Sequence, residues 1–170
     1  MASSSVLMAP RDITSIILTD GTSGTALDYT LIYEVGDFSF EDVLATREVS
    51  HDRGSISHVT PGDDQPSTWS FSVRATEFTN GGADALIDFI KGAGNLAARV
   101  TIGTGSFKRN DLFLFKMVMT VEASNHGSVD HTVTFPLCAV DSYSWSEGSP
   151  GATFEVSGQC YGAIVYTGPT

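Results

Sequence analysis

Short runs in which apolar and polar side chains alternate every second residue recur along almost the whole chain. In the clearest run, 69–76, every odd-numbered residue is apolar and every even-numbered residue is polar. Successive side chains of a strand point to opposite faces, so this pattern is typical of a half-buried β-strand. A chain composed mostly of such runs must bury its strand faces against one another, which favours packed β-sheets.

Turn-forming residues separate further candidate strands. We expect these strands at 13–19, 27–35, 38–41, 43–50, 54–60, 98–102, 112–123, 128–137, 140–146 and 153–161. The pair 43–50 and 54–60 is joined by a His-Asp-Arg-Gly turn, which predicts a long β-hairpin. A loop with two prolines and a glycine follows at 61–66. We therefore treat 43–68 as a hairpin arm with its loop.

One stretch, about 82–92, has the apolar spacing of a helix. Asn80 or Asp84 is expected to cap its start, and Gly92 or Gly94 to end it. The predicted class is mainly β, with two packed antiparallel sheets forming a sandwich or partial barrel, one flanking helix and the arm. We expect a single domain over 1–170, with flexible ends at 1–11 and 164–170.

The charge balance limits the possible partners. The 170 residues include 9 Lys and Arg against 20 Asp and Glu, a formal net charge of -11. Binding to a nucleic-acid backbone depends on Lys and Arg displacing counterions, so this chain is not expected to grip DNA. Only 17% of the residues are charged, and Ser, Thr and Gly supply much of the polarity. That composition suits half-polar strands and tight turns.

The ends and the cysteines indicate where the chain is made. The first ten residues have no basic segment followed by a long apolar run, so no secretory signal is expected. No apolar stretch approaches the roughly 20 residues of a membrane-spanning helix. We expect a soluble protein made in a cytoplasm, without a membrane partner. Cys138 and Cys160 fit either two free thiols or one disulfide.

Candidate catalytic and ligand-binding motifs have simpler structural explanations. His51 and His58 flank the hairpin turn without a third ligand at metal-like spacing. The string 21–24 is too short for a nucleophile elbow, and 92–97 follows a helix where a dinucleotide fingerprint follows a strand. Scattered carboxylates offer pairs, but no pair is singled out for glycoside hydrolysis. We expect no catalytic residue, cofactor or metal, and a structural protein in place of an enzyme.

Four segments carry a family resemblance. They are 52–72, 133–138, 143–151 and 157–162, the third containing the turn Ser146-Glu147-Gly148-Ser149-Pro150. Together they resemble the tail tube (major tail) proteins of long-tailed bacteriophages. The resemblance implies a self-assembling subunit whose hexameric rings stack into a hollow tube that delivers DNA. It also implies partners, namely further copies, a tape measure protein, tail tip and tail terminator proteins, and genomic DNA passing without specific binding. The implied location is the virion tail, assembled in the host cytoplasm.

The same resemblance implies that four strands, 38–50, 68–77, 112–123 and 128–137, face the tube lumen. The matching polar residues are Ser39, Glu41, Thr46, Glu48, Ser70, Ser72, Arg74, Thr76, Lys116, Thr120, Glu122, Asp130, Thr132 and Thr134. Four carboxylates against two cations leave this set mildly acidic. A hydroxyl-rich wall of that charge would let DNA slide without adhering.

The arm is the expected contact between subunits and between rings, because it has too few large apolar residues to form a core alone. The residues expected to make these contacts are His51, Asp52, Arg53, His58, Pro61, Asp63, Asp64 and Pro66.

Two alternative functions stay open at this stage. One is the tube protein of a contractile machine, such as a secretion or pyocin-like system, which would add a sheath as partner. The other is a carbohydrate-binding β-sandwich, which would need exposed aromatic side chains. We expect Trp69 and Trp145 to be buried, which disfavours the second alternative.

Overall fold

Antiparallel strands make up most of the structure, a computed structural model that describes residues 13–31, 38–43, 45–74, 85–102, 112–121, 131–148 and 151–168. The elements in chain order are β1 (Ile13–Thr19), β2 (Asp28–Leu31), β3 (Phe38–Glu41), β4 (Arg47–Asp52), β5 (Ser55–Pro61), β6 (Ser67–Arg74), α1 (Leu86–Lys91), the 3₁₀ turn η1 (Gly94–Leu96), β7 (Phe115–Val121), β8 (His131–Gly148), β9 (Gly151–Cys160) and β10 (Val165–Thr167). The expected mainly β class is confirmed.

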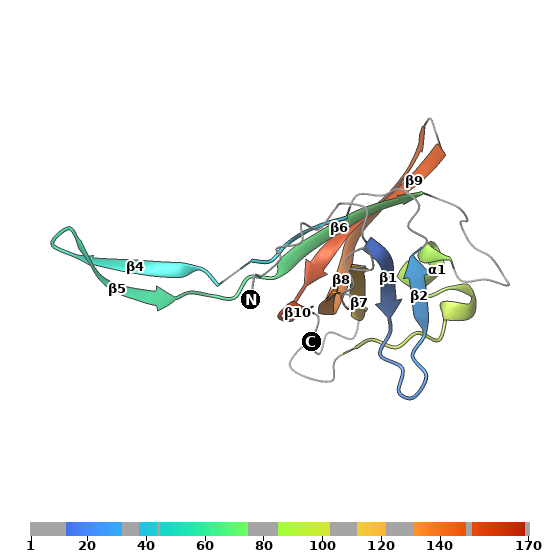
Figure 1. The fold of residues 1–170 in the computed structure, drawn as a ribbon, viewed down its shortest axis with the longest axis horizontal. Helices are drawn as coiled ribbons and strands as arrows, with labels where there is room; N and C mark the ends of the chain where they lie inside the picture. The colour runs from blue at the N-terminus through green and yellow to red at the C-terminus, as the bar shows by residue number, and fades with distance from the viewer. Residues whose placement is uncertain are drawn as a thin grey trace, which may run out of the picture.

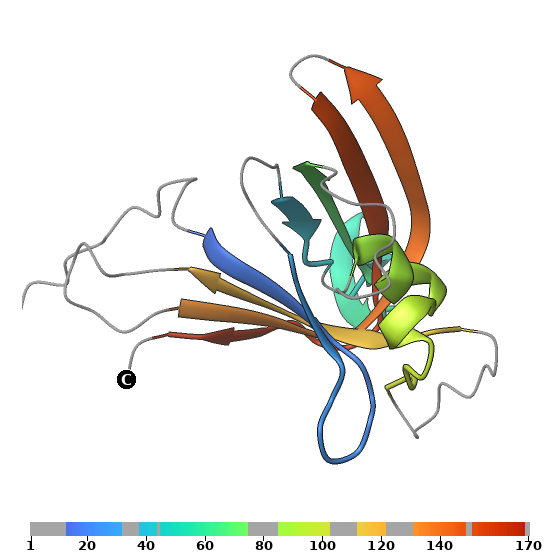
Figure 2. The ribbon, with the colours of Figure 1, turned by 90° about the vertical axis from the view of Figure 1, so that its right-hand side faces the viewer.

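Eight strands form one sheet and the remaining two form the arm. The order in the large sheet is β2-β1-β7-β8-β9-β6-β3, with β10 also paired to β8. The first part of β8 pairs with β7 and β10, and the part after Cys138 pairs with β9. Figures 1 and 2 show the β8–β9 hairpin rising steeply from the layer of β1, β7 and β10, so the sheet is strongly bent.

The core lies inside this bend. Alternate residues of β7, beginning with Phe115 and Met117, are buried, as are Ile16 and Leu18 of β1. The rings of Phe38 and Phe40 on β3 lie 5.9 and 5.2 Å from that of Phe135 on β8, centroid to centroid. Two parts of one continuous sheet therefore pack on each other, and each fully buried large side chain contributes about 1.5–3 kcal/mol.

Helix α1 covers one flank of the core. Its Phe89 ring meets the Phe113 and Phe115 rings edge-on, at 5.6 and 5.4 Å. Gly92 ends the helix in the left-handed conformation with φ 66°, as expected. The first cap position is Ala85, which makes no side-chain capping bond, while Asn80 and Asp84 lie outside the described residues. No helix in the described ranges is long and apolar enough to cross a membrane.

The prediction of a strand at 98–102 is wrong. This segment is turn and irregular structure after η1. Its backbone groups bond elsewhere: the Val100 N–H donates to the Asp20 carboxylate at 2.9 Å, and the Val100 carbonyl accepts from the Gly21 N–H at 2.7 Å. Those partners hold 98–102 against the β1–β2 loop, so the segment is not available to a sheet ladder.

Other differences concern strand limits. The strands expected at 128–137 and 140–146 are one strand, β8, whose pairing with β9 shifts register between Val140 and Ser142. Such a bulge bends a strand without ending it. Val165–Thr167, expected within a flexible end, form β10 on β8. The prediction for residues 1–11 lies outside the described residues.

Candidate functional site

One face of the large sheet is lined with hydroxyl groups. Ser39, Ser70, Ser157 and Ser142 stand opposite one another in a row across β3, β6, β9 and β8. Because cross-strand partners point to the same side, they share a face opposite the buried aromatics. We call this surface the serine face. Its described members are Ser39, Glu41, Thr68, Ser70, Ser72, Ser142, Ser144, Ser146, Thr153, Glu155, Ser157 and Gln159.

The hydroxyls of the serine face bond to one another. Ser39 and Ser70 Oγ atoms are 2.8 Å apart, and so are those of Ser142 and Ser157. Shallow clefts of about 440 and 250 Å³ lie along this row, and both include Ser39, Ser70 and Ser157. With their hydrogen bonds shared laterally, these hydroxyls present a polar surface with no strong charge-assisted binding group.

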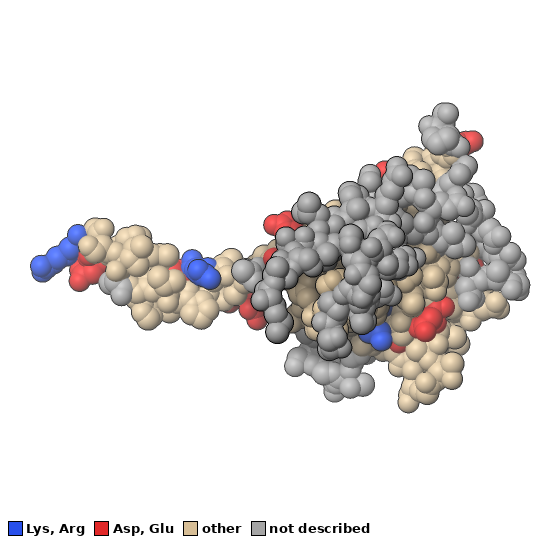
Figure 3. Space-filling view, in the orientation of Figure 1, with Lys and Arg blue, Asp and Glu red and all other residues tan. Residues whose placement is uncertain are grey.

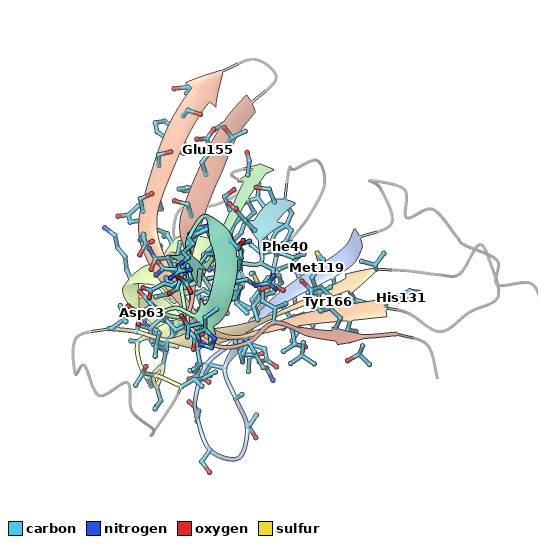
Figure 4. The ribbon with its side chains drawn as sticks, turned by 90° about the vertical axis from the view of Figure 1, so that its left-hand side faces the viewer. Phe40, Asp63, Met119, His131, Glu155 and Tyr166 are labelled. Carbon is cyan, nitrogen blue, oxygen red and sulfur yellow. The ribbon has the colours of Figure 1, made fainter. Side chains whose placement is uncertain are left out.

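The described charges on this face are acidic. Glu41 and Glu155 project from it, and Asp141 lines the larger cleft beside them. Figure 4 shows Glu155 on the projecting β8–β9 hairpin. No Lys or Arg side chain that the structure describes belongs to the serine face. One arginine, Arg74, pairs with Thr153 of this face in the register of β6 and β9, and its side chain lies outside the described part. The described side chains of the face therefore include none of the basic groups with which a protein holds nucleic-acid phosphates.

The residues predicted to face a lumen fall into separate places. Four of them, Ser39, Glu41, Ser70 and Ser72, lie on the serine face. Lys116, Thr120, Thr132 and Thr134 lie on β7 and the first part of β8, where Thr120 opposes Thr132. Thr46 and Glu48 belong to the arm and its root. The Arg74 side chain, Thr76, Glu122 and Asp130 lie outside the described part. Lumen exposure stays a prediction for all of them.

Sequence reasoning missed the central part of the serine face. Strand β9 lies between β8 and β6, so Glu155 and Ser157 join Ser70 on the same surface. The signal was present as alternating serines at 142, 144 and 146. Which strands stand beside them depends on sheet order, and local alternation does not report that order.

The arm is a two-stranded hairpin that extends away from the body (Figure 1). Every residue of β4 is exposed. Val49 opposes Val59, and these residues and Ile56 leave 44, 48 and 65% of their surfaces in solvent. We call this set, Val49, Ile56 and Val59, the arm valine cluster. In the monomer these three aliphatic side chains are therefore exposed to solvent, on an element that does not pack on the core.

The predicted contact residues follow the length of the arm. His51, Asp52, Arg53 and His58 are exposed in the hairpin, and Pro61, Asp63, Asp64 and Pro66 lie from its end to its root. His58 opposes Ser50 while His51 opposes Ile56, so the two histidines lie on opposite faces. Figure 3 shows basic side chains on the arm, whose two arginines are Arg47 and Arg53. Among the described residues, no group of three His, Cys, Asp or Glu has the arrangement of a metal site.

A hydrogen-bond network fixes the root of the arm to the body. Ser67, which is buried, donates to an Asp42 carboxylate oxygen and accepts from the Val43 N–H, both at 3.2 Å. The other Asp42 oxygen accepts from the Tyr166 hydroxyl at 3.0 Å. Burial and the Asp42 charge raise the pKa of Tyr166. This network ties the start of β6 to the C-terminal strand β10.

The prediction that Trp145 is buried is wrong. Trp145 is 45% exposed, and Tyr143, two residues before it on the same strand, is 39% exposed. Both point to the apolar side of β8, where their partners on β9, Val156 and Phe154, are buried, so their exposure comes from their place on the edge of the sheet. Between 142 and 148, β8 pairs with β9 on one side, and no other described strand pairs with it. Trp145 therefore does not count against a carbohydrate-binding module.

Comparison with known proteins gives relationships of fold. No family model matches the sequence, and no curated protein matches it. Among solved structures, a chain of the sheath/tube terminator of the extracellular contractile injection system PVC is 12% identical with a TM-score of 0.60, over 95% of this chain and 99% of that one. A chain of the PVC sheath-tube complex is 13% identical with a TM-score of 0.58, over 99% of each chain. The SPP1 tail tube protein is 11% identical with a TM-score of 0.51, over 91% of this chain and 77% of that one.

The chain thus has the fold shared by tube proteins of a phage tail and of a contractile injection system. The resemblance to tail tube proteins expected from the sequence is confirmed at the level of the fold. These neighbours are structural tube proteins.

Proposed function

We propose that the protein is a structural subunit that polymerises as stacked hexameric rings into the hollow tube of a phage tail, a conduit for DNA. The observation that carries the proposal is the exposed arm on a body with the tube-protein fold. The proposed partners are further copies, a tape measure protein, and tail tip and terminator proteins. The proposed location is the virion tail, after assembly in the host cytoplasm.

The arm makes physical sense as a contact between copies. An isolated two-stranded hairpin is marginally stable in water at best, and this one buries none of β4. Docking the arm valine cluster on a neighbouring copy would remove three aliphatic side chains from water. Each such burial contributes about 1.5–3 kcal/mol when complete. Repeated in every subunit, this contact supports stacking of rings.

The β8–β9 hairpin supplies a second surface for assembly. The 142–148 edge of β8 presents backbone groups that no described strand covers. Open edges of this kind pair readily with other chains, and a closed ring uses them up. Tyr143 and Trp145 belong to the same edge segment, and a neighbouring copy that paired with this edge would cover them as well.

The serine face is our candidate for the lumen wall. Its serines bond to one another, and its described charges are carboxylates. DNA would meet like charge and neutral hydroxyls, with no basic array to displace its counterions. It could then pass without specific binding.

A second candidate is the tube of a contractile machine, as the PVC chains have higher TM-scores than the SPP1 protein, 0.60 and 0.58 against 0.51. Ring, lumen and arm would keep their roles, and a sheath would cover the outside. Co-sedimentation of assembled tubes with a sheath protein encoded beside this chain would favour this candidate.

The arm test uses the triple variant Val49→Ser, Ile56→Ser and Val59→Ser. We expect it to keep the circular dichroism of the wild type and to stay monomeric in sedimentation velocity at concentrations where the wild type assembles. Val100→Ser, which changes a valine on the body that is 47% exposed, is the control and should assemble normally. Assembly of the triple variant at the wild-type concentration would show that the arm is not the contact.

A further inference from the structure

Two cysteines face each other where the large sheet changes direction. Cys138 on β8 is the direct cross-strand partner of Cys160 on β9, and it also opposes Phe115 on β7. Both side chains are buried, with 0 and 2% of their surfaces exposed, and both are free thiols. The assembly surfaces described above use neither of them.

The backbone geometry at this pair suits a disulfide. Directly opposed residues of antiparallel strands have Cα atoms about 4.5–5.5 Å apart. Disulfides form at Cα separations of about 4.4–6.8 Å, so neither strand has to move far. Cys138 Sγ donates to the Phe135 carbonyl oxygen at 3.6 Å, and Cys160 Sγ donates to the Gly162 carbonyl oxygen at 3.4 Å.

The two thiols differ in reactivity. Cys160 lines a cleft of about 330 Å³ at the root of the arm, beside Asp42 and Ser67, which gives a small reagent an approach. The neighbouring Cys138 thiol lowers the pKa of Cys160, against the opposing effect of burial. The interaction with Cys160, together with burial, raises the pKa of Cys138. Cys160 is thus the thiol that reacts first, and Cys138 is placed to react second.

We propose that Cys138 and Cys160 are an oxidisable pair that closes to an intramolecular disulfide with a low-molecular-weight disulfide as oxidant. The Cys160 thiolate attacks one sulfur of the small disulfide and expels one small thiolate, leaving a mixed disulfide on Cys160. Cys138 loses its proton to solvent and attacks the Cys160 sulfur, which expels the second small thiolate. Two protein thiols lose two electrons, and the small disulfide is reduced to two small thiols that take up the two protons.

The new bond would hold the sheet at its bend. It would link β9 to the point where β8 also pairs with β7, and it would close the loop from 138 to 160. Cross-linking of this kind stabilises the folded chain relative to the unfolded one. If the chain is a tail tube subunit, it would assemble with reduced thiols in the cytoplasm and oxidise outside the cell. This timing rests on the proposed function, whereas the thiol chemistry does not.

The test exposes the unassembled full-length protein to oxidised glutathione at neutral pH. We expect the intact mass to fall by two hydrogen atoms, both thiols to become unreactive to maleimide after denaturation, and a peptide map to link Cys138 to Cys160. The oxidised protein should melt several degrees higher than the reduced one. Because no tube has to form, failure of this test and failure of tube assembly are separate results.

Two single variants check the order of reaction. Cys138→Ser should stop at a glutathione adduct on Cys160, and Cys160→Ser should leave Cys138 unmodified over the same time. Oxidised glutathione applied to urea-unfolded wild type controls for reagent activity. The proposal is overturned if the native wild type keeps both thiols while the unfolded protein reacts. Separate glutathione adducts on the two cysteines, with no link between them, would also overturn it.

Discussion

Asp20 is a buried carboxylate that organises three segments of the chain. Its oxygens accept hydrogen bonds from the N–H groups of Thr22 at 3.1 Å, Leu27 at 2.8 Å and Val100 at 2.9 Å, and from the Thr22 hydroxyl. Burial alone would raise the pKa of Asp20, but these hydrogen bonds outweigh it and hold the pKa below its ordinary value. The charged form is therefore part of the folded state.

Replacing Asp20 by Asn should destabilise the protein by about 1–3 kcal/mol at pH 7, because an amide cannot accept all these bonds and leaves buried donors unpaired. A lowered pKa contributes stability above the unfolded value of about 3.9, and that contribution is lost as the pH falls through the folded value. The difference between wild type and variant should accordingly shrink at about pH 3. Urea unfolding at both pH values measures it. A difference that is the same at both would contradict the assigned role of the charge.

Gly158 on β9 is required by a close approach. A Cβ at this position would lie 2.5 Å from Cζ2 of Trp69 and closer still to the Ala139 carbonyl oxygen. Trp69 is 2% exposed and stacks on Phe71, so it has little room to move.

Gly158→Ala should therefore cost about 1–3 kcal/mol, the usual cost of overpacking a core. The matched control is Gly148→Ala, where a Cβ meets no described atom within 4 Å. Thermal unfolding should separate the two variants by several degrees. Equal melting temperatures would mean that the Trp69 indole can shift to accommodate the methyl group.

The burial and the role of a single residue can be predicted when they depend on the neighbouring sequence, and not when they depend on distant segments. Trp69 and Phe71 are predicted as buried because alternation along one strand reports its two faces. Trp145 has the same alternation, yet it is exposed because β8 is an edge of the described sheet at this position, which local alternation does not report. The role of Asp20 depends on Val100, which lies 80 positions away in the sequence, so no local pattern indicates it.

At the scale of elements, local sequence patterns predict the strands, whereas pairing between distant segments decides where each strand lies in the sheet. The strand 13–19 has the predicted bounds, and the hairpin of β4 and β5 follows from its turn. The continuity of β8 and the place of β9 between β8 and β6 come from pairings between distant segments. For that reason the residues of the serine face on β3 and β6 could be predicted in part, and those on β9 could not.

The exposure of the arm predicts how quickly its backbone amides exchange with solvent. Its strands pair only with each other among the described strands, and its side chains are exposed, so its amides should exchange quickly in the free protein. Docking on a neighbour should slow them by at least an order of magnitude (about 1.4 kcal/mol per tenfold). Hydrogen exchange of 47–61 in monomer and assembly measures this change, with β7, which lies between β1 and β8, as the internal control. Equal protection in both states would show that the arm does not dock.

At the scale of the whole molecule, the features that a monomer does not need lie outside the core. The arm and the β8–β9 hairpin extend in different directions from the body (Figures 1 and 2), and both carry exposed apolar side chains. The body has a continuous core of aromatic and aliphatic residues, to which β9 contributes Phe154 and Val156, whereas no described residue of the arm belongs to it. A molecule of this shape, with the tube-protein fold, is best explained by repeated contacts between copies.

Negative-stain electron microscopy of the concentrated, purified protein tests this account most directly. We predict rings or hollow tubes with an axial channel, assembled from this chain alone or once a tail-tip initiator is added. Particles that remain monomeric under both conditions would contradict the proposal that the chain is a tube subunit.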